Sequence, residues 1–432
     1  MSKPFRNQKT IFVLFAGILI IATFIGAIWW MFLSVGRHIG LTDPPKASEA
    51  IHIEKVNLSK EYSFSSISSH DDVDDAVGFG GRLTAKAEGF KDLVTNIFVE
   101  QHPFAPHYYY LFGITNRLLG RNVIENSEKN VLRLSDGKLV FADHFESAPS
   151  ANNRIADFAK WLHNRSTDFL YVLPASKSDD SLIDYPKGFE TEFFKNYSAF
   201  TSFLQEQEIS CLDAREMLLA TNKDFYSYFY NTDHHWNVQA GLLTAAEITE
   251  RLANEFSYPV NCSIINESNF ESVIYPKAML GSIGRKTTLG YTDAEDMEVL
   301  YPKFETDFYV THPESGIAYD GEMRGNLIFP QLISKRYYSG GTAYSAFMEG
   351  DISLVRIKNR KCDNDVHALV LKESKANIVI PYLACTVEYL DIIDPRYFHG
   401  SIRTFIEKTN PDIVLIISLG PSSDEDTTWE LK

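Results

Sequence analysis

An uncharged apolar run near the N-terminus limits the topology of this chain more than any other feature of its sequence. Residues 11–35 have the sequence IFVLFAGILIIATFIGAIWWMFLSV, which contains no charged residue. At about 1.5 Å per helical residue, a run of this length crosses a hydrocarbon core of about 30 Å with some tilt. We therefore predict one N-terminal transmembrane helix that precedes the rest of the chain.

The charges that flank this run predict its orientation. Lys3, Arg6 and Lys9 precede the run, whereas only Arg37 follows it closely. Basic residues favour the cytoplasmic side, so we expect a cytoplasmic tail at residues 1–10 and an extracytoplasmic C-terminal part, in a single-pass cell-membrane protein. The alternative is a cleaved signal peptide, but the apolar regions of such peptides span only about 7–15 residues.

Composition divides the remainder into a linker and one large domain. Residues 36–75 combine Pro44 and Pro45 with several serines and a run of acidic residues, and they lack apolar periodicity, which is typical of a stalk. From residue 76 to residue 432 the composition is steady and no internal repeat occurs. We expect this second part to form a single extracytoplasmic domain.

Charge and cysteine content exclude several classes of function. The chain has 41 basic and 57 acidic residues, a formal net charge of −16, and no finger-type Cys/His spacing, which argues against nucleic-acid binding. Its four cysteines are scattered without a C-x-x-C pair, so we expect neither a zinc ribbon nor a redox motif, although one disulfide remains possible. We expect no cofactor.

Short apolar runs that end in polar loops predict an α/β fold with a central parallel sheet. The clearest runs are Phe169–Leu173, Ala368–Leu371 and Ile413–Ile417. Two helices are expected between the last two runs, near Ile378–Cys385 and at Ser401–Lys408, with Ser401 as an N-cap. Residues at the carboxyl ends of such strands face the crevice in which these sheets bind ligands.

The polar cluster Asp233-His234-His235-Trp236 precedes a predicted helix that runs from Asn237 to about Phe256. One interpretation is structural: Asn231, Thr232 or Asp233 caps the helix, and Trp236 packs beneath it. The D-x-H spacing suggests chemistry instead, because Asp233 can hold Nδ1–H of His235 and leave Nε2 free as a general base. A metal site at His234 and His235 is disfavoured, since neighbouring side chains diverge and no third ligand lies nearby in the sequence.

The Asp-His-His-Trp segment resembles the signature of the bacterial DHHW proteins, which belong with the SGNH-hydrolase-like alginate O-acetylation proteins. Two further segments are similar to that group, GSIGRKTTLGYTDAEDMEVLYPKFET at residues 281–306 and SKANIVIPYLACTVEYLDIIDPRYF at residues 374–398. The resemblance covers about residues 170–419. It implies an SGNH-hydrolase-like α/β domain in which a D-x-H-W motif precedes a catalytic serine.

In that family the serine follows a strand and a Gly-Asp pair, and here the corresponding turn is Lys372-Glu373-Ser374. The resemblance therefore implies a triad of Ser374, His235 and Asp233. We expect Ser374 Oγ within about 2.6–3.2 Å of His235, the Asp233 carboxylate on the opposite ring nitrogen, and His234 pointing elsewhere. Lys372 in place of glycine leaves open whether the site is active or silent.

Four further residues are weaker candidates for substrate binding: Arg396, Asn377, Lys177 and Trp236. Arg396 matches an arginine of the family and would bind an acyl carbonyl or a sugar carboxylate, with a buried ion pair to Asp394 as the alternative. Lys177 follows a predicted strand and would face the crevice, with a solvated surface lysine as the alternative.

The resemblance implies an O-acyltransferase, most simply an O-acetyltransferase, that modifies a cell-surface or secreted polysaccharide. It also implies a multispanning membrane-bound O-acyltransferase as the partner that supplies the acyl group. Two alternatives use the same domain: an esterase that removes acyl groups from polysaccharide, and a catalytically silent domain that binds polysaccharide or scaffolds the membrane acyltransferase complex.

Overall fold

The computed structural model describes residues 105–125, 130–142, 148–183, 185, 189, 191–333, 342–421, 423, 427–429 and 431. They all belong to one compact unit, Asp92–Lys432. The predicted cytoplasmic tail, transmembrane helix and stalk lie outside the described residues. Within the described part of the chain, no helix combines the length and hydrophobicity that crossing a bilayer requires.

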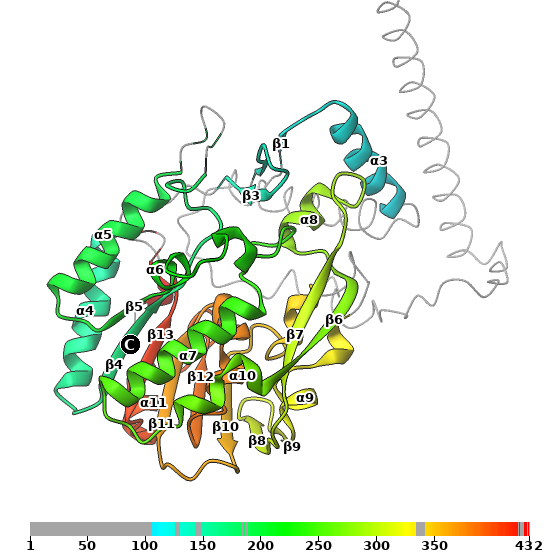
Figure 1. The fold of residues 1–432 in the computed structure, drawn as a ribbon. Helices are drawn as coiled ribbons and strands as arrows, with labels where there is room; N and C mark the ends of the chain where they lie inside the picture. Colours follow the sequence, from blue (N-terminus) through cyan, green and yellow to red (C-terminus); the bar gives the residue numbers. More distant parts are fainter. Residues whose placement is uncertain are drawn as a thin grey trace, which may run out of the picture. The chain divides into compact units, whose positions relative to one another are not determined.

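An eight-stranded sheet forms the centre of the described unit, with strand order β5-β4-β13-β11-β12-β10-β8-β9 (Figure 1). Its strands are β4 (Asp168–Leu173), β5 (Cys211–Asp213), β8 (Phe308–His312), β9 (Ile317–Gly321), β10 (Leu354–Asn359), β11 (His367–Lys372), β12 (Tyr389–Ile393) and β13 (Ile413–Ile417). The three predicted apolar runs lie in β4, β11 and β13, which are neighbours in this sheet. They therefore form the centre of the fold, as predicted.

The expectation of a parallel sheet is correct for only part of this sheet. The pairs β5-β4, β4-β13, β13-β11 and β11-β12 are parallel. Strand β10 pairs antiparallel with both β12 and β8, and β8 pairs antiparallel with β9, so the sheet is mixed. The antiparallel strands are less uniformly apolar and some alternate between buried and exposed residues, a pattern that a search for continuous apolar runs does not detect.

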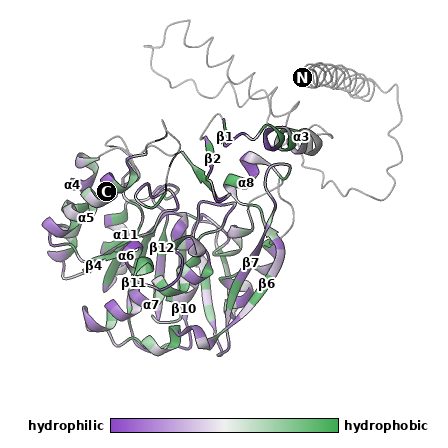
Figure 2. Cartoon of the chain, turned by 45° about the horizontal axis from the view of Figure 1, so that its top comes forward, coloured by the Kyte–Doolittle hydropathy of each residue, from purple (hydrophilic) through white to green (hydrophobic). Residues whose placement is uncertain are grey.

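Helices cover both faces of the parallel strands, which explains the continuous apolar runs in β4, β11 and β13. Residues Leu170 and Val172 of β4 pack in one cluster with α7 (Val238–Asn254), whereas Tyr171 and Leu173 pack in another with α4 (Pro149–His163), α5 (Phe193–Glu206) and α11 (Ile402–Thr409). Successive strand residues point to opposite faces. The covering helices are amphipathic, and hydrophilic and hydrophobic residues alternate along them (Figure 2).

The helix ends correct two details of the sequence analysis. Helix α7 begins one residue after Asn237, whose Oδ1 accepts hydrogen bonds from the N–H groups of Gln239 and Ala240, so Asn237 and not residues 231–233 is the cap. The helix predicted near residues 378–385 is two short turns, η7 (Ser374–Ile378) and α10 (Ile380–Leu383). The predicted cap Ser401 of α11 is confirmed, since its side chain accepts from the N–H of Thr404.

The remaining elements surround the central sheet. Strands β1 (Val123–Ile124), β2 (Val131–Arg133) and β3 (Leu139–Phe141) form a small antiparallel sheet, and β6 (Phe270–Met279) pairs with β7 (Glu295–Pro302). The other helices and turns are α3 (Ala105–Leu118), α6 (Ala214–Leu219), η2 (Phe225–Tyr228), η3 (Cys262–Ile265), η4 (Glu267–Asn269), α8 (Ser282–Thr287), α9 (Met323–Asn326), η5 (Pro330–Leu332), η6 (Ala343–Ala346) and η8 (Thr427–Trp429). All four cysteines are free thiols.

Candidate active site

The Asp-His-His-Trp segment forms a hairpin-like loop between η2 and α7, which we name the Asp-His loop (residues 229–236). Phe229 and Trp236 pair as an antiparallel bridge at its base. The N–H of Tyr230 donates to the carbonyl of His235 at 3.3 Å. These backbone contacts fold the loop back on itself, so that residues 231–234 occupy its tip.

The serine turn lies at the carboxyl end of β11, as the sequence predicts. Strand β11 ends at Lys372, and Ser374 is the first residue of η7. The indole N–H of Trp236 donates to the carbonyl of Lys375 at 2.8 Å and so joins the Asp-His loop to this turn. Gly241 allows α7 to approach η7 closely, because a Cβ there would lie 2.9 Å from the carbonyl oxygen of Ile378.

The structure brings Ser374, His235 and Asp233 into one hydrogen-bonded chain. His235 Nε2 lies 2.8 Å from Ser374 Oγ, and His235 Nδ1 lies 2.6 Å from Asp233 Oδ1. Both distances and the assignment of the two ring nitrogens agree with the geometry expected from the sequence. A serine, an imidazole and a carboxylate in this order are able to activate the serine hydroxyl as a nucleophile.

Asp233 is fully buried, and several donors surround its carboxylate. Oδ1 accepts from the backbone N–H of His235 at 2.9 Å, and Oδ2 accepts from the N–H of Ser282 at 2.6 Å. Burial alone would raise the pKa of this carboxyl, but the neighbouring charges of His235 and His234 and the hydrogen bonds from His235 outweigh it and hold the pKa well below its usual range. The carboxylate is therefore ionised at neutral pH and holds the His235 ring in one orientation.

Two glycines explain why the segment GSIG lies against the Asp-His loop. A Cβ on Gly281 would lie 2.1 Å from Asp233 Oδ2, and a Cβ on Gly284 would lie 2.8 Å from Cβ of Thr232. The N–H of Gly284 also donates to the carbonyl of Thr232 at 2.7 Å. Only residues without a side chain allow α8 to approach the loop this closely.

Tyr344 contacts both the histidine and the serine turn. Its ring stacks on the His235 ring, with 3.9 Å between centroids and 8° between planes. Its hydroxyl donates to the carbonyl of Ser374 at 3.0 Å. Burial raises the pKa of this phenol well above its ordinary value, so it remains a neutral donor.

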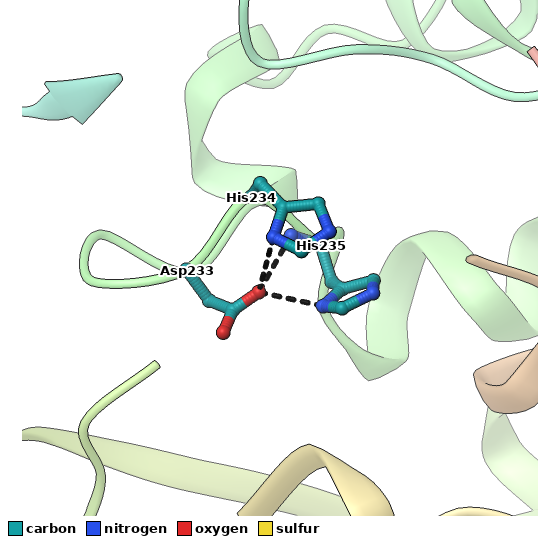
Figure 3. Close-up of side chains that lie close together, drawn as sticks. All are labelled: Asp233, His234 and His235. Atoms are coloured by element: carbon teal, nitrogen blue, oxygen red, sulfur yellow. Dashed lines mark hydrogen bonds and ion pairs between the residues drawn. The ribbon is translucent and has the colours of Figure 1, made fainter. Parts of the chain in front are cut away.

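His234 departs from the expectation that it points away from the site. Its Nδ1 lies 3.3 Å from Asp233 Oδ1, the oxygen that also holds His235 (Figure 3). The same Nδ1 lies 2.7 Å from Ser282 Oγ. The two histidine rings lie 3.9 Å apart between centroids. Asp233, His234 and His235 thus offer ligand atoms within 4.8 Å of one another, a spacing that a metal ion would fit. Hydrogen bonds occupy these same atoms, and we assign no metal to them.

Two of the candidate binding residues, Lys177 and Trp236, do not face a crevice. Lys177 is 2% exposed and donates to carbonyls of the Asp-His loop, so both the crevice and the surface interpretation are wrong. Trp236 has no exposed surface, and its indole N–H is bonded to Lys375. Each side chain supports the loop from within the protein and has no surface left for a substrate.

Asn377 and Arg396 belong to a partly buried charge network beside the serine turn, in which Lys372 and Asp394 are buried and Asp351 and Arg396 reach the surface. Lys372 Nζ lies 3.0 Å from Asp351 and 3.1 Å from Asp394, and Arg396 contacts the same two carboxylates. The ion pair of Arg396 with Asp394 is therefore present, as the alternative predicted. Asn377 is 1% exposed, and its side chain donates to Asp351 at 3.0 Å instead of facing solvent.

A cavity of about 320 Å³ lies elsewhere, beside α7. Leu242, Leu243 and Ile265 line it together with residues of the 221–223 segment, and none of the three hydrogen-bonded residues contributes to it.

Residues 134–271 match the family model of the SGNH hydrolase-like domain of the acetyltransferase AlgX, a segment that includes Asp233 and His235 and ends before Ser374. The predicted resemblance to SGNH-hydrolase-like alginate acetylation proteins is thereby confirmed, and the chain contains an SGNH-like α/β domain. Comparison with curated proteins gave no match.

Solved structures that share this fold include two of one protein and one of another. PatB1 from Bacillus cereus is 20% identical, with 71% of this chain and 100% of that chain covered and a TM-score of 0.56. A second PatB1 structure carries a sulfonyl adduct and is 19% identical, with coverage of 70% and 97% and a TM-score of 0.56. A DHHW family protein from Eubacterium siraeum is 18% identical, with coverage of 69% and 92% and a TM-score of 0.51.

Proposed function

We propose that this chain is an O-acyltransferase that carries an acyl group, most simply acetyl, on Ser374 and passes it to a polysaccharide hydroxyl. The observation that supports this most directly is the hydrogen-bonded chain from Ser374 through His235 to Asp233. The match to the SGNH-like domain of an acetyltransferase supports the acetyl group. The polysaccharide acceptor follows from the resemblance to the alginate O-acetylation proteins.

The first half of the reaction forms the acyl-enzyme. Ser374 Oγ attacks the carbonyl carbon of the acyl donor while His235 Nε2 takes the hydroxyl proton, and the imidazolium gives that proton to the departing donor group. Asp233 stabilises the imidazolium through Nδ1–H. The N–H of Ser374 has no partner among the described residues, so it is available to the carbonyl oxygen as negative charge develops there.

The second half releases the acyl group to the acceptor. A sugar hydroxyl attacks the Ser374 ester while His235 takes its proton, and the proton returns to Ser374 Oγ as the acyl–oxygen bond breaks. Water in place of the sugar would give the esterase alternative with the same residues. The silent-domain alternative rested on Lys372, and its side chain forms ion pairs with Asp351 and Asp394 without displacing Ser374 from His235.

The reaction is tested with the full chain in detergent, an activated aryl acetate as donor and oligosaccharides as acceptors. We expect acetylated oligosaccharide in excess of free acetate, detected by mass spectrometry. Acetate release without sugar acetylation would identify an esterase, and no consumption of the ester above the uncatalysed rate would support the silent domain.

We further propose that residues 11–35 anchor the domain to the outer face of the cell membrane. We also propose that a multispanning membrane-bound O-acyltransferase supplies the acyl group. The uncharged run and the preceding basic residues support this orientation. Protease added to intact cells is expected to degrade the C-terminal domain. A domain that is degraded only after lysis would contradict this topology, and a soluble form that starts beyond Val35 would indicate a cleaved signal peptide.

A further inference from the structure

We propose that Lys177 and Glu295 are positioning residues that hold the Asp-His loop in its reactive geometry, an inference that rests on the proposed function. We name these two residues the positioning pair. Their hydrogen bonds go to the backbone of the loop and not to Ser374 or the His235 ring, so each residue acts through the loop backbone.

Lys177 binds the carbonyl groups of the loop. Its Nζ lies 2.7 Å from the carbonyl oxygens of Tyr230 and Asn231 and 3.3 Å from that of Asp233. An ammonium group has three N–H donors, and these three carbonyls use all of them. Burying an ammonium is costly unless its hydrogen bonds are satisfied, so this lysine is matched to a loop conformation in which all three carbonyls converge.

Glu295 binds the amide groups of the same segment. It is the first residue of β7, and its carboxylate accepts from the N–H of Asn231 at 2.7 Å and from both the N–H and the hydroxyl of Thr232 at 2.6 Å. Lys177 thus binds the acceptors, and Glu295 the donors, of adjacent peptide groups. Their opposite charges also stabilise each other across the loop, since each favours the charged form of the other.

The position of the loop decides whether the triad works. Asp233 and His235 belong to the loop, whereas Ser374 belongs to the turn after β11, so the distance of 2.8 Å between His235 and Ser374 depends on loop placement. A displacement of about 1 Å between reacting groups is enough to reduce a rate about 100-fold. Loss of either member of the positioning pair frees peptide groups at residues 230–233 and should lengthen this distance.

The environment of Lys177 predicts how the rate of acyl transfer depends on pH. Burial lowers the pKa of Lys177 to about 8, although Glu295, Asp233 and Asp136 favour its cation and only Lys138 opposes it. Above this pH the neutral amine has two donors for three carbonyls. The rate should therefore fall as the pH rises through about 8.

Loss of the Lys177 proton would lower the rate without destabilising the fold. A lysine whose pKa is about 8 when folded and 10.5 when unfolded binds its proton less tightly in the folded state. Its contribution to folding stability therefore increases, and does not decrease, as the pH rises between these values. A fall in activity near pH 8 without a fall in unfolding temperature would be specific to the loop.

The test compares Lys177→Met and Glu295→Gln with Lys408→Met, a control at an exposed position of α11. In the full chain we expect kcat for acyl transfer to fall at least about 10-fold in Lys177→Met, with KM changed less than about 2-fold. The alkaline limb near pH 8 should vanish in Lys177→Met. It should move to lower pH in Glu295→Gln, because that variant loses the charge that favours the Lys177 cation.

A second measurement does not depend on transfer. The rate at which phenylmethylsulfonyl fluoride labels Ser374, measured by mass spectrometry, reports activation of the serine by His235 alone. Lys177→Met and Glu295→Gln should label at least about 10-fold more slowly than wild type. If wild type is labelled at Ser374 but transfers no acyl group, the proposed function is contradicted. The labelling rates of the two variants then still decide whether the positioning pair holds the loop. Unchanged kcat, labelling rate and pH profile in both variants would overturn the proposed positioning role. If Lys177→Met does not fold, the measurements on Glu295→Gln decide the question.

Discussion

Replacing Ser374 with alanine is expected to reduce acyl transfer by at least about 1,000-fold while the domain remains folded. The hydroxyl is the group that bonds to the acyl carbon, and among the described residues its one side-chain hydrogen-bond partner is His235 at 2.8 Å. His235→Ala should reduce the rate by a similar factor, because Ser374 and His235 act together and the loss of either one stops the reaction. The measurement is kcat/KM with an aryl acetate and an oligosaccharide acceptor.

The matched controls are the double variant and His234→Ala. Ser374→Ala combined with His235→Ala should be no less active than either single variant, since effects within one catalytic unit are not additive. His234 contacts Asp233 and Ser282 but does not contact Ser374 in the hydrogen bonds of the structure, so its removal should cost much less. Ser374→Ala with undiminished transfer would end the catalytic interpretation, even if the fold is intact.

The sequence was sufficient to predict the centre of the fold and the hydrogen-bonded chain of Ser374, His235 and Asp233, for physical reasons. Strands β4, β11 and β13 are buried on both faces, so their apolar runs are unbroken. Asp233 and His235 are two residues apart, which makes their contact a local property of one loop. Ser374 was identified through resemblance and its position after a strand, because no local pattern relates it to a histidine 139 positions away.

Strand β12 illustrates why the contacts between strands could not be predicted. Its sequence YLDII is interrupted by Asp391, and a buried carboxylate argues against a central strand. The structure satisfies this carboxylate with Arg356 at 2.8 Å and 3.2 Å and with His367 at 3.0 Å, contacts that connect three separate strands. No spacing within the sequence predicts such partners.

The supporting residues of the site were missed for the same reason. Tyr344 stacks on His235, and Glu295 binds the loop tip, from positions that are 109 and 64 residues away from those partners. Lys177 was identified as a residue at a strand end, but its role was mistaken because a lysine is expected at the surface. Only the fold reveals that three carbonyl groups converge on its ammonium group.

Replacing Lys372 with glycine, the residue that the family resemblance implies at this position, is expected to destabilise the domain by about 3 kcal/mol and not to improve activity. Lys372 is 2% exposed, and its ammonium contacts the carboxylates of Asp351 and Asp394. Without it, Arg396 alone would balance two buried or half-buried negative charges. Removing one partner of a buried ion pair leaves the other charge uncompensated.

The unfolding free energy from denaturant titration measures this effect, and Lys372→Met separates its two causes. Methionine keeps most of the apolar stem but lacks the charge, so it should be destabilised nearly as much as glycine if the ion pairs dominate. Lys372 and Arg396 also favour the ionised form of Asp351 and hold its pKa below the usual range despite burial. This stabilisation is present at neutral pH and is lost as the pH falls through the lowered pKa of Asp351, so the variants should approach wild type in acid. If Lys372→Gly proved as stable as wild type and more active, the lysine would be a defect in the serine turn, and the silent-domain alternative would regain its support.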